Sequence, residues 1–189
     1  MILVIDTSAP TAEVALIEGN KVADAYTPTR AELIPLLRRI ARSNSITKVA
    51  VTTGPGSFTG LRAGVSFGLG LAKGLGVPIV ALTTLDLQAA RSEEPVTAVV
   101  DAGRGRLFYL VPGRPVALGE PRDIPSDHEL VGRVESHEAF ASAGHRFKRD
   151  GELRSLGEAA VKMLETAGEV PYRNLKIEYM QSFSAPRKK

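Results

Sequence analysis

The sequence contains no cysteine and no tryptophan, and aromatic residues make up 5% of its 189 residues. Without cysteine the chain has no disulfide framework, no thiol nucleophile and no thiolate metal site. Histidine is scarce as well. The three in the chain, His128, His137 and His145, match no metal-binding spacing, so we expect ordinary surface histidines. The composition argues against cysteine chemistry and against a histidine-based metal centre.

Long uninterrupted hydrophobic runs are also missing. The longest apolar region, residues 65–82, is rich in glycine and contains Lys73 and Pro78, a pattern typical of a buried helix and strand rather than of a membrane span. The chain opens on a strand-like run that reaches Asp6 without a basic stretch, so no secretory signal is expected. These features predict a cytoplasmic protein with no membrane contact.

Charge of one sign is not in excess either. The net charge is +3, and Arg187, Lys188 and Lys189 account for all of it. Nucleic-acid binding draws most of its affinity from many lysine and arginine contacts to phosphate. A neutral body therefore gives little support for direct RNA binding. The basic tail is expected to be a solvated end, with contact to tRNA in a larger assembly as the alternative.

Glycine, in contrast, is abundant, and its densest run is Gly-Pro-Gly-Ser-Phe-Thr-Gly-Leu-Arg-Ala-Gly at residues 54–64. The run follows the apolar stretch 49–53 and opens a segment without a break until Pro78, which predicts a strand-to-helix turn capped by Ser57 or Thr59. Such a turn can hold an anion at the helix N-terminus. The Lys-Ser/Thr pair of a nucleotide-binding P-loop is absent, so a tight structural turn is the favoured interpretation.

The helix after this turn carries two rows of small residues at four-residue spacing. One row is Gly60, Gly64, Gly68, Ala72 and Gly76, and the other is Ser66, Gly70 and Gly74. Each glycine inside a helix costs about 1 kcal/mol relative to alanine. Residues four apart share a face, so each row permits close approach of another backbone. One row is expected to pack inside the protein. For the second row, contact with another subunit stays an open alternative.

The order of strand and helix patterns predicts an α/β protein, and its length allows one compact domain or two small lobes, of which we expect two. Residues 1–95 form the first lobe, with strands over 2–6, 13–18, 22–27, 49–53 and 78–82 and helices over 31–43 and 85–90 beside the glycine helix. The polar, proline-closed stretch 92–95 marks the boundary. Residues 96–189 form the second lobe, with strands over 96–100 and 106–111 and a helix over 152–167.

Two runs carry a resemblance to a known family. The opening Ile-Leu-Val-Ile-Asp-Thr-Ser at residues 2–8 and the Gly-Pro-Gly-Ser-Phe-Thr-Gly-Leu-Arg run resemble the bacterial TsaB (YeaZ) family, and residues 101–109 resemble a further family segment. The likeness fades past about Val111. The resemblance implies a ribonuclease-H-like lobe of the actin, Hsp70 and sugar-kinase superfamily, followed by a reduced second α/β lobe.

The resemblance also implies a function. This family is the non-catalytic partner of the TsaD-like threonylcarbamoyltransferase, with which it dimerises to support formation of N6-threonylcarbamoyladenosine at position 37 of tRNA. The metal-binding histidines of the catalytic relatives align with Thr84 and Gln88, neither of which is a usual metal ligand. We therefore expect no catalytic residue, no metal site and no activity of the chain's own.

The resemblance sets further expectations about partners and cofactors. The expected interface residues, on the helix 31–43 and the glycine helix, are Leu37, Ile40, Gly60, Gly64, Phe67, Gly68 and Leu71. The same patch is expected to form a self-dimer. No cofactor is required, although ATP or ADP with Mg²⁺ can belong to the complex, as can a TsaE-like ATPase and, indirectly, tRNA.

Other interpretations stay open. Asp6, Thr7 and Ser8 lie where the superfamily has its first phosphate motif, which makes a stand-alone nucleotide-binding, kinase-like enzyme the alternative function; an Asx or Ser/Thr turn explains them without a ligand. A protease that uses Ser57 ranks last, because no histidine is near it in sequence. Asp101 and Arg104 form either a second-lobe site or a local ion pair. Residues 177–181 can be the counterpart of a Pro-x-Tyr-x-Arg element of the family.

Overall fold

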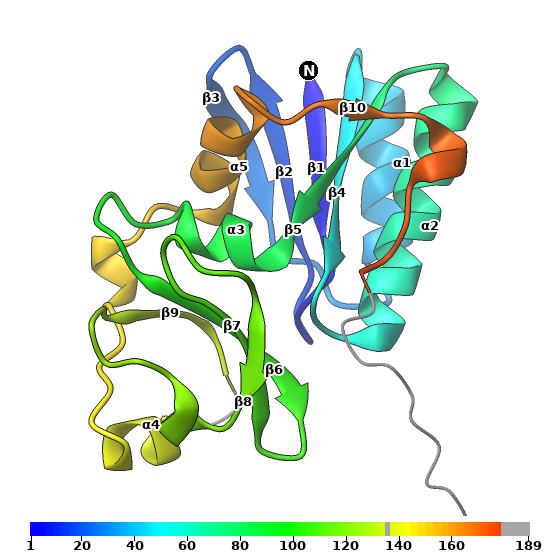
Figure 1. Ribbon diagram of the computed structural model, residues 1–189. Coiled ribbons are helices and arrows are strands. Elements are labelled where there is room, and N and C mark those ends of the chain that lie inside the picture. Colours follow the sequence, from blue (N-terminus) through cyan, green and yellow to red (C-terminus); the bar gives the residue numbers. More distant parts are fainter. Residues whose placement is uncertain (135–136, 179–189) are drawn as a thin grey trace, which may run out of the picture.

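The computed structural model describes residues 1–134 and 137–178, which form two sheets with helices around them (Figure 1). The basic residues 187–189 and most of the 177–181 element lie outside the described residues. No described helix is both long and apolar enough to cross a membrane.

The first sheet has six strands in the order β10-β5-β4-β1-β2-β3. The antiparallel meander comprises β1 (Ile2–Asp6), β2 (Glu13–Glu18) and β3 (Lys21–Tyr26). Parallel to β1 run β4 (Lys48–Gly54) and β5 (Ile79–Thr83), and β10 (Glu169–Val170) closes the edge. The central strands are nearly continuous apolar runs because helices cover both faces. This strand order confirms the predicted ribonuclease-H-like lobe.

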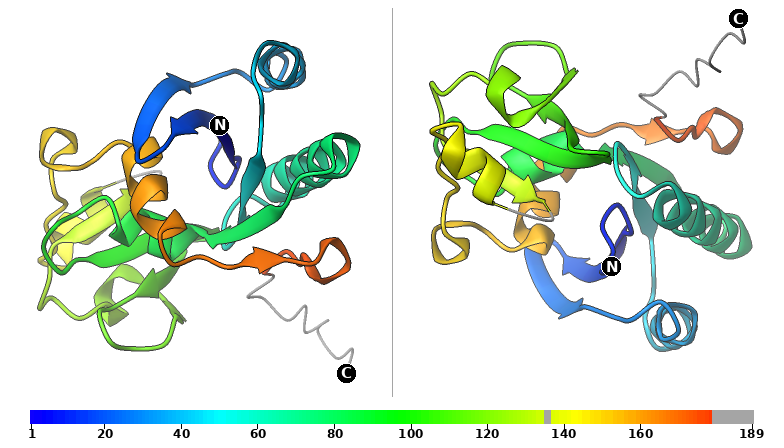
Figure 2. Two further views of the ribbon diagram at one scale, coloured as in Figure 1. Left: turned by 90° about the horizontal axis from the view of Figure 1, so that it is seen from above. Right: turned by 90° about the horizontal axis from the view of Figure 1, so that it is seen from below.

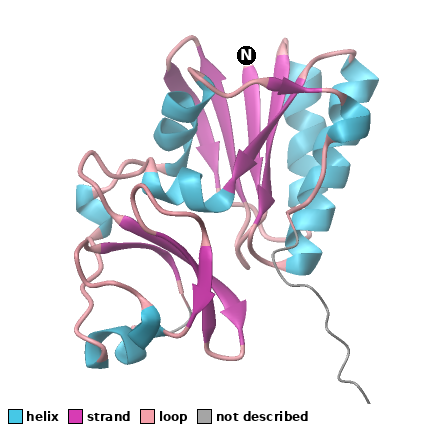
Figure 3. Ribbon diagram, in the orientation of Figure 1, coloured by secondary structure: helices cyan, strands magenta, loops and turns pink. Residues whose placement is uncertain are grey.

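Helices cover both faces of this sheet (Figures 2 and 3). On one face lie α1 (Leu33–Ser43) and α2 (Phe58–Leu75), which pack against Leu3, Ile5 and Val51. On the other face lie α3 (Thr84–Ala89) and α5 (Leu156–Leu164), which pack against Val4 and Ala50. Alternate residues of a strand point to opposite faces, so the apolar strands β1 and β4 supply both cores.

The second sheet has four strands in the order β8-β7-β6-β9. It comprises β6 (Thr97–Gly103), β7 (Arg106–Leu110), β8 (Ala117–Gly119) and β9 (Leu130–Arg133), with the short helix α4 (Glu138–Ser142) beside it. Short 3-10 turns lie at Pro121–Asp123, Asp150–Glu152 and Tyr172–Asn174. Helix α3 joins the two lobes, because Leu87 packs in the first core and Leu85 in the core under the second sheet.

The division of the chain at residue 95 needs a correction. From Ser155 onward the chain returns to the first lobe, where α5 covers β2 and β10 extends the sheet. The segment then crosses the end of α2: the Tyr172 hydroxyl donates to the carbonyl of Val77 at 2.6 Å, and the Glu178 N–H donates to Thr53 O at 2.8 Å. Residues 96–189 are therefore not one lobe.

The C-terminal helix is also shorter than its apolar pattern predicts. Ser155 caps α5 through a reciprocal capping box with Glu158, and residues 150–152 form a separate 3-10 turn. The serine side chain fixes the start of the helix, whereas the hydrophobic periodicity over 152–167 extends beyond both of its ends.

Candidate functional site

The glycine-rich turn between β4 and α2 is packed onto the loop after β1. Ser57 caps α2 by accepting a hydrogen bond from the Gly60 N–H at 3.2 Å, and its own N–H donates to Ser8 O at 2.7 Å. A β-carbon on Gly56 would lie 2.5 Å from Ser8 O, and φ there is +154°. Glycine is therefore required by close approach to the neighbouring loop, as the interpretation of a tight structural turn predicts.

The residues of the proposed phosphate motif are mostly bonded inside the protein. Asp6 is 1% exposed, and its Oδ1 accepts hydrogen bonds from the Ser8 N–H at 2.9 Å and the Thr52 hydroxyl at 2.7 Å. The Thr7 hydroxyl donates to Gly60 O at 2.8 Å. The first of these bonds is an Asx turn, one of the alternatives open from the sequence. Of these three residues, Ser8 lines a cavity.

Four of the expected interface residues lie in the interior instead, which corrects their assignment. On α1, Leu37 and Ile40 are 3% and 2% exposed. On α2, a β-carbon on Gly64 would overlap the Thr7 side chain and one on Gly68 would overlap Val51. The row that contains them packs against the protein's own sheet and cannot receive another chain.

The other expected interface residues differ in their positions. Gly60 is half-buried, and a β-carbon on it would overlap the Thr7 carbonyl, so this glycine also serves an internal contact. Phe67 and Leu71 are half-buried at the margin of the same core. These two side chains remain available for an interface at the border of the outer face of α2.

The large hydrophobic residues that are exposed in the described chain lie on α1 and α2. Ile34 on α1 is 37% exposed, and Phe58 and Leu75 on α2 are 47% and 42% exposed. Between the latter two lie Gly70 and Gly74, which have no heavy atom within 4 Å of an added β-carbon. Hence a side chain added at either of these glycines of the second row would meet no atom of the described monomer, unlike one added at Gly64 or Gly68 of the first row.

Basic side chains accompany this apolar surface. Arg38, Arg39 and Arg42 are exposed on α1, and within the described part of the chain none of them forms an ion pair. On α2, the Arg62 guanidinium stacks over the Phe58 ring at 3.8 Å from its centroid. The two helices thus combine exposed apolar side chains, bare glycines and positive charge.

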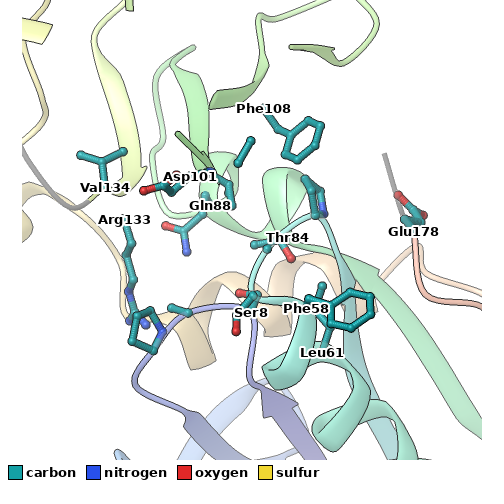
Figure 4. Close-up of a pocket in the computed structure, with 18 residues that line it drawn as sticks. Ser8, Phe58, Leu61, Thr84, Gln88, Asp101, Phe108, Arg133, Val134 and Glu178 are labelled. Atoms are coloured by element: carbon teal, nitrogen blue, oxygen red, sulfur yellow. Dashed lines mark hydrogen bonds between the residues drawn. The ribbon is translucent and has the colours of Figure 1, made fainter. Parts of the chain in front are cut away.

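A cavity of about 730 Å³ lies between the two lobes (Figure 4). The first lobe contributes the loop after β1, the glycine-rich turn and α3, and the second lobe contributes β6, β7 and the end of β9. Glu178, from the returning C-terminal segment, completes the lining. Most of the remaining lining residues are apolar, as is usual for small-molecule sites.

Two polar side chains of α3 line this cavity and are 2% exposed: Thr84 and Gln88. They are four residues apart and so share one helical face. Gln88 Oε1 accepts a hydrogen bond from Arg91 at 3.2 Å. The Thr84 hydroxyl oxygen has no hydrogen-bond partner among residues 1–134 and 137–178. In the sequence these two positions stand out only because they align with the metal-binding histidines of the catalytic relatives.

The charged groups of the cavity are mainly acidic. Asp101 accepts a hydrogen bond from the Gly103 N–H at 2.5 Å and pairs with no arginine that the structure describes, so the Asp101–Arg104 ion pair is not formed. Arg133 is ion-paired with Glu13 of β2. Partial burial raises the pKa of the Glu178 carboxyl, and nearby Asp86 raises it further.

The histidines lie in the second lobe, away from Ser57. His137 stacks on Phe147 with ring centroids 4.3 Å apart, and His145 Nε2 contacts Pro121 O at 2.9 Å. His145 is 8% exposed, so the expectation of a surface histidine is wrong there. In the described ranges no three His, Cys, Asp or Glu side chains gather in a way that could hold a metal ion.

Known proteins resemble this chain both in sequence and in fold. The family model for TsaD, tRNA N6-adenosine threonylcarbamoyltransferase, matches residues 33–172. The tRNA threonylcarbamoyladenosine biosynthesis protein TsaB of Bacillus subtilis is 31% identical over 120 residues, 57% of this chain and 52% of that protein. The TsaB of Escherichia coli is 30% identical over 122 residues, 57% and 53% of the two chains. The chain thus matches about half the length of these curated relatives.

A solved structure agrees over almost the whole chain. YeaZ from Pseudomonas aeruginosa superposes with a TM-score of 0.70 at 19% identity, covering 95% of this chain and 99% of that one. Sheet topology and superposition define the class first: an α/β protein with the fold of the solved YeaZ structure. Within that class, the chain belongs to the TsaB (YeaZ) family, which is related to the TsaD transferases. The resemblance noted from the sequence is confirmed, and the match to the TsaD model extends past Val111 to residue 172.

Proposed function

We propose that the chain is a non-catalytic partner subunit. It pairs with a TsaD-like threonylcarbamoyltransferase through the outer faces of α1 and α2 and supports formation of N6-threonylcarbamoyladenosine at position 37 of tRNA. The observation that carries this proposal is that Ile34, Phe58 and Leu75, the large hydrophobic side chains exposed in the described residues, all lie on these two helices. Phe58 and Leu75 lie at the two ends of α2, so the exposed apolar side chains flank the bare glycines of this helix, and such exposed apolar surface supports a protein–protein interface on the two helices.

The uncontacted glycines of α2 support close pairing at this surface. Gly70 and Gly74 each cost the isolated helix about 1 kcal/mol relative to alanine, and no contact in the described monomer requires them. A partner helix that lies across them would make use of the missing side chains. Phe67 and Leu71 border this row, so they are retained in the proposed interface.

The charge on α1 indicates an acidic partner surface. Arg38, Arg39 and Arg42 would meet carboxylates on the transferase, and such complementarity accelerates association and selects the partner. In a self-dimer the same patch faces its own copy. Repulsion between the two sets of arginines would then make the self-dimer the weaker complex.

The experiment is a comparison of three variants by light scattering after size exclusion, with and without the TsaD-like protein. Gly70→Arg places a long side chain on the outer face of α2 and is expected to abolish the complex. Gly70→Ala adds a single methyl group to the space that the partner helix uses and should weaken the complex less. Gly151→Arg, which also has open space for a side chain but lies in the second lobe, is the matched control. If Gly70→Arg still pairs normally with the TsaD-like protein, the contact must lie elsewhere on the chain.

In this proposal the assembly, rather than this chain, carries the chemistry. No residue of the chain is assigned a catalytic role and no cofactor is required by it. ATP or ADP with Mg²⁺, a TsaE-like ATPase and tRNA enter with the other subunits, in the cytoplasm.

A stand-alone nucleotide-binding enzyme remains the second candidate, because the cavity between the lobes has the size of a ligand site. Its expected phosphate residues are already bonded elsewhere: Asp6 to Ser8 and Thr52, and Thr7 to Gly60. Calorimetry of the isolated chain with ATP and Mg²⁺ distinguishes the two functions, since a partner subunit needs no tight binding there.

A further inference from the structure

We propose that ionic contacts between the two segments that connect the lobes lock the lobes at one angle, and that the lock is released when these contacts are screened or removed. The chain passes from the first lobe to the second over residues 90–96, the first connection, and returns over residues 148–155, the second connection. The two connections lie side by side next to α3 (Figure 1). All of the contacts belong to the single chain, so the lock does not depend on pairing with a transferase.

Arg91 and Arg154 join the two connections at their centre. The Arg154 N–H donates to Arg91 O at 2.8 Å, and Arg91 Nε donates to Arg154 O at 3.0 Å. The Arg91 guanidinium also donates to Gln88 Oε1 at 3.2 Å, which ties the contact to α3. Rotation of one lobe against another needs connecting residues that can change their φ and ψ angles. Here neither connection can do so without breaking a bond to the other.

Three ion pairs extend this contact along both connections. Each pair joins a basic side chain of one connection to an exposed carboxylate of the other: Lys148–Glu94 at 2.6 Å, Arg154–Glu93 at 2.6 Å and Arg91–Asp150 at 3.7 Å. The basic side chains are largely buried, with exposed fractions of 11%, 29% and 13% in that order. Because a largely buried cation is costly without a counter-charge, the carboxylates hold these side chains against the opposite connection.

Contacts outside the connections oppose rotation as well. Leu87 of α3 packs in the first lobe and Leu85 packs under the second sheet. Beside the cavity, Arg133 at the end of β9 is ion-paired with Glu13 of β2. Lobes that are tied through different elements at two places cannot turn about one of them without breaking the other. The ionic contacts are the part of this arrangement that salt weakens, whereas α3 keeps the lobes attached.

Spin labels on the full chain can measure the lobe angle without background, because the chain has no cysteine of its own. Arg39→Cys on α1 combined with Ala141→Cys on α4 places one label at an exposed position of each lobe. Double electron–electron resonance then gives the distribution of distances between the labels. Locked lobes should give one narrow distribution at low salt, and about 1 M salt should widen it by screening the ion pairs.

Two triple variants in this labelled background test the ion pairs themselves. The lock variant removes the three carboxylates that join the connections and should widen the distribution at least about twofold: Glu93→Gln, Glu94→Gln and Asp150→Asn. The matched control removes three carboxylates that each pair within one lobe: Glu120→Gln, Asp127→Asn and Glu169→Gln. The control changes the net charge equally and should keep the parental width. Glu94→Gln alone leaves two of the three pairs and should give an intermediate width, which keeps the test decisive if the lock variant does not fold.

Amide hydrogen exchange separates release of the lock from a general loss of stability. In the lock variant the Arg154 N–H, which bonds to Arg91 O, should exchange several-fold faster than in the parent. The amides of β1, inside the six-stranded sheet, should exchange at the parental rate. Gly70→Arg, designed to disrupt pairing with a transferase, should keep the narrow distance distribution, so that this proposal and the proposed function can fail separately.

Three results would overturn the lock. A parental distribution as wide as that of the lock variant shows that the lobes already rotate. A lock variant, or Glu94→Gln in its place, that stays as narrow as the control shows that the ion pairs do not set the angle. Equal widening of both triple variants assigns the effect to overall charge rather than to the connections.

Discussion

Gly64 of α2 lies directly against Thr7 in the loop after β1, so that a β-carbon on Gly64 would overlap the Thr7 hydroxyl group. That hydroxyl already donates to Gly60 O at 2.8 Å. The glycine therefore lets α2 approach the sheet closely enough for the helix backbone to bond to the neighbouring loop. The contact joins the glycine-rich turn to the loop after β1 and holds Thr7 in an internal network.

Gly64→Ala should consequently destabilise the protein. The added methyl group must push Thr7 aside or displace the helix, and forced overpacking of this kind costs about 1–3 kcal/mol. Urea unfolding monitored by circular dichroism measures the effect, which should appear as a lower midpoint with an unchanged slope. A variant as stable as the parent would show that α2 can shift on the sheet without cost.

Gly70→Ala should have the opposite effect, although the substitution is chemically identical and lies in the same helix. An added β-carbon at Gly70 meets no heavy atom within 4 Å, so alanine gains about 1 kcal/mol of helix propensity without a clash. The same unfolding experiment should give a higher midpoint. Destabilisation at Gly70 would mean that this face of α2 is covered in the monomer.

The contrast between these two glycines explains what the sequence could predict of the fold and what it could not. Hydrophobic runs gave the strands β1, β4 and β5 and the capped turn into α2, because these signals are local. Spacing also showed that α2 has two faces of small residues. It could not tell which face is internal, since both rows have the same period and the distinction depends on how the helix is rotated over the sheet.

The remaining discrepancies also arise from long-range contacts. The family resemblance placed Leu37 and Ile40 in an interface, but both side chains are buried in the core beside the sheet. The pairing of β10 with β5 joins residues 169–170 to 79–80, a contact that no local pattern records. Thr84 and Gln88 gained importance only when the lobes enclosed them, because an unpartnered hydroxyl is visible in a structure and not in a sequence.

Removal of the cap of α5 should reveal how much the returning C-terminal segment stabilises the first lobe. Ser155 Oγ accepts a hydrogen bond from the Glu158 N–H, and the Glu158 carboxylate accepts one from the Ser155 N–H at 2.8 Å. Ser155→Ala is expected to cost about 1 kcal/mol. Thermal unfolding at neutral pH measures this loss, and a variant with parental stability would show that packing alone holds the helix in place.

The same capping box should make stability depend on pH. Hydrogen bonds from the Ser155 side chain and backbone lower the pKa of Glu158 below its ordinary value of 4.5. A folded-state pKa below the unfolded one stabilises the protein above the unfolded value, and this stabilisation is lost as the pH falls through the lowered folded pKa. Ser155→Ala should therefore cost less in acid than at neutral pH. An equal cost at both pH values would contradict ionic capping by Glu158.

Reversal of charge on α1 should slow pairing with the transferase without unfolding the chain. Arg38→Glu combined with Arg42→Glu alters two exposed side chains that form no ion pair in the described structure, so folding should be little affected. Because complementary charge acts mainly on association, stopped-flow or biosensor measurements should show a several-fold lower association rate at low salt. The deficit should shrink as salt screens the interaction.

Arg146→Glu provides the control for this effect. Arg146 is exposed in the second lobe and forms no ion pair among the described residues, so the substitution changes the net charge at a distance from α1. If overall charge governed association, each reversed arginine would slow it equally. If the proposed surface is correct, Arg146→Glu leaves the rate close to that of the parent, while the double variant on α1 also shifts the balance toward the self-dimer, because the new Glu residues relieve the repulsion between two copies.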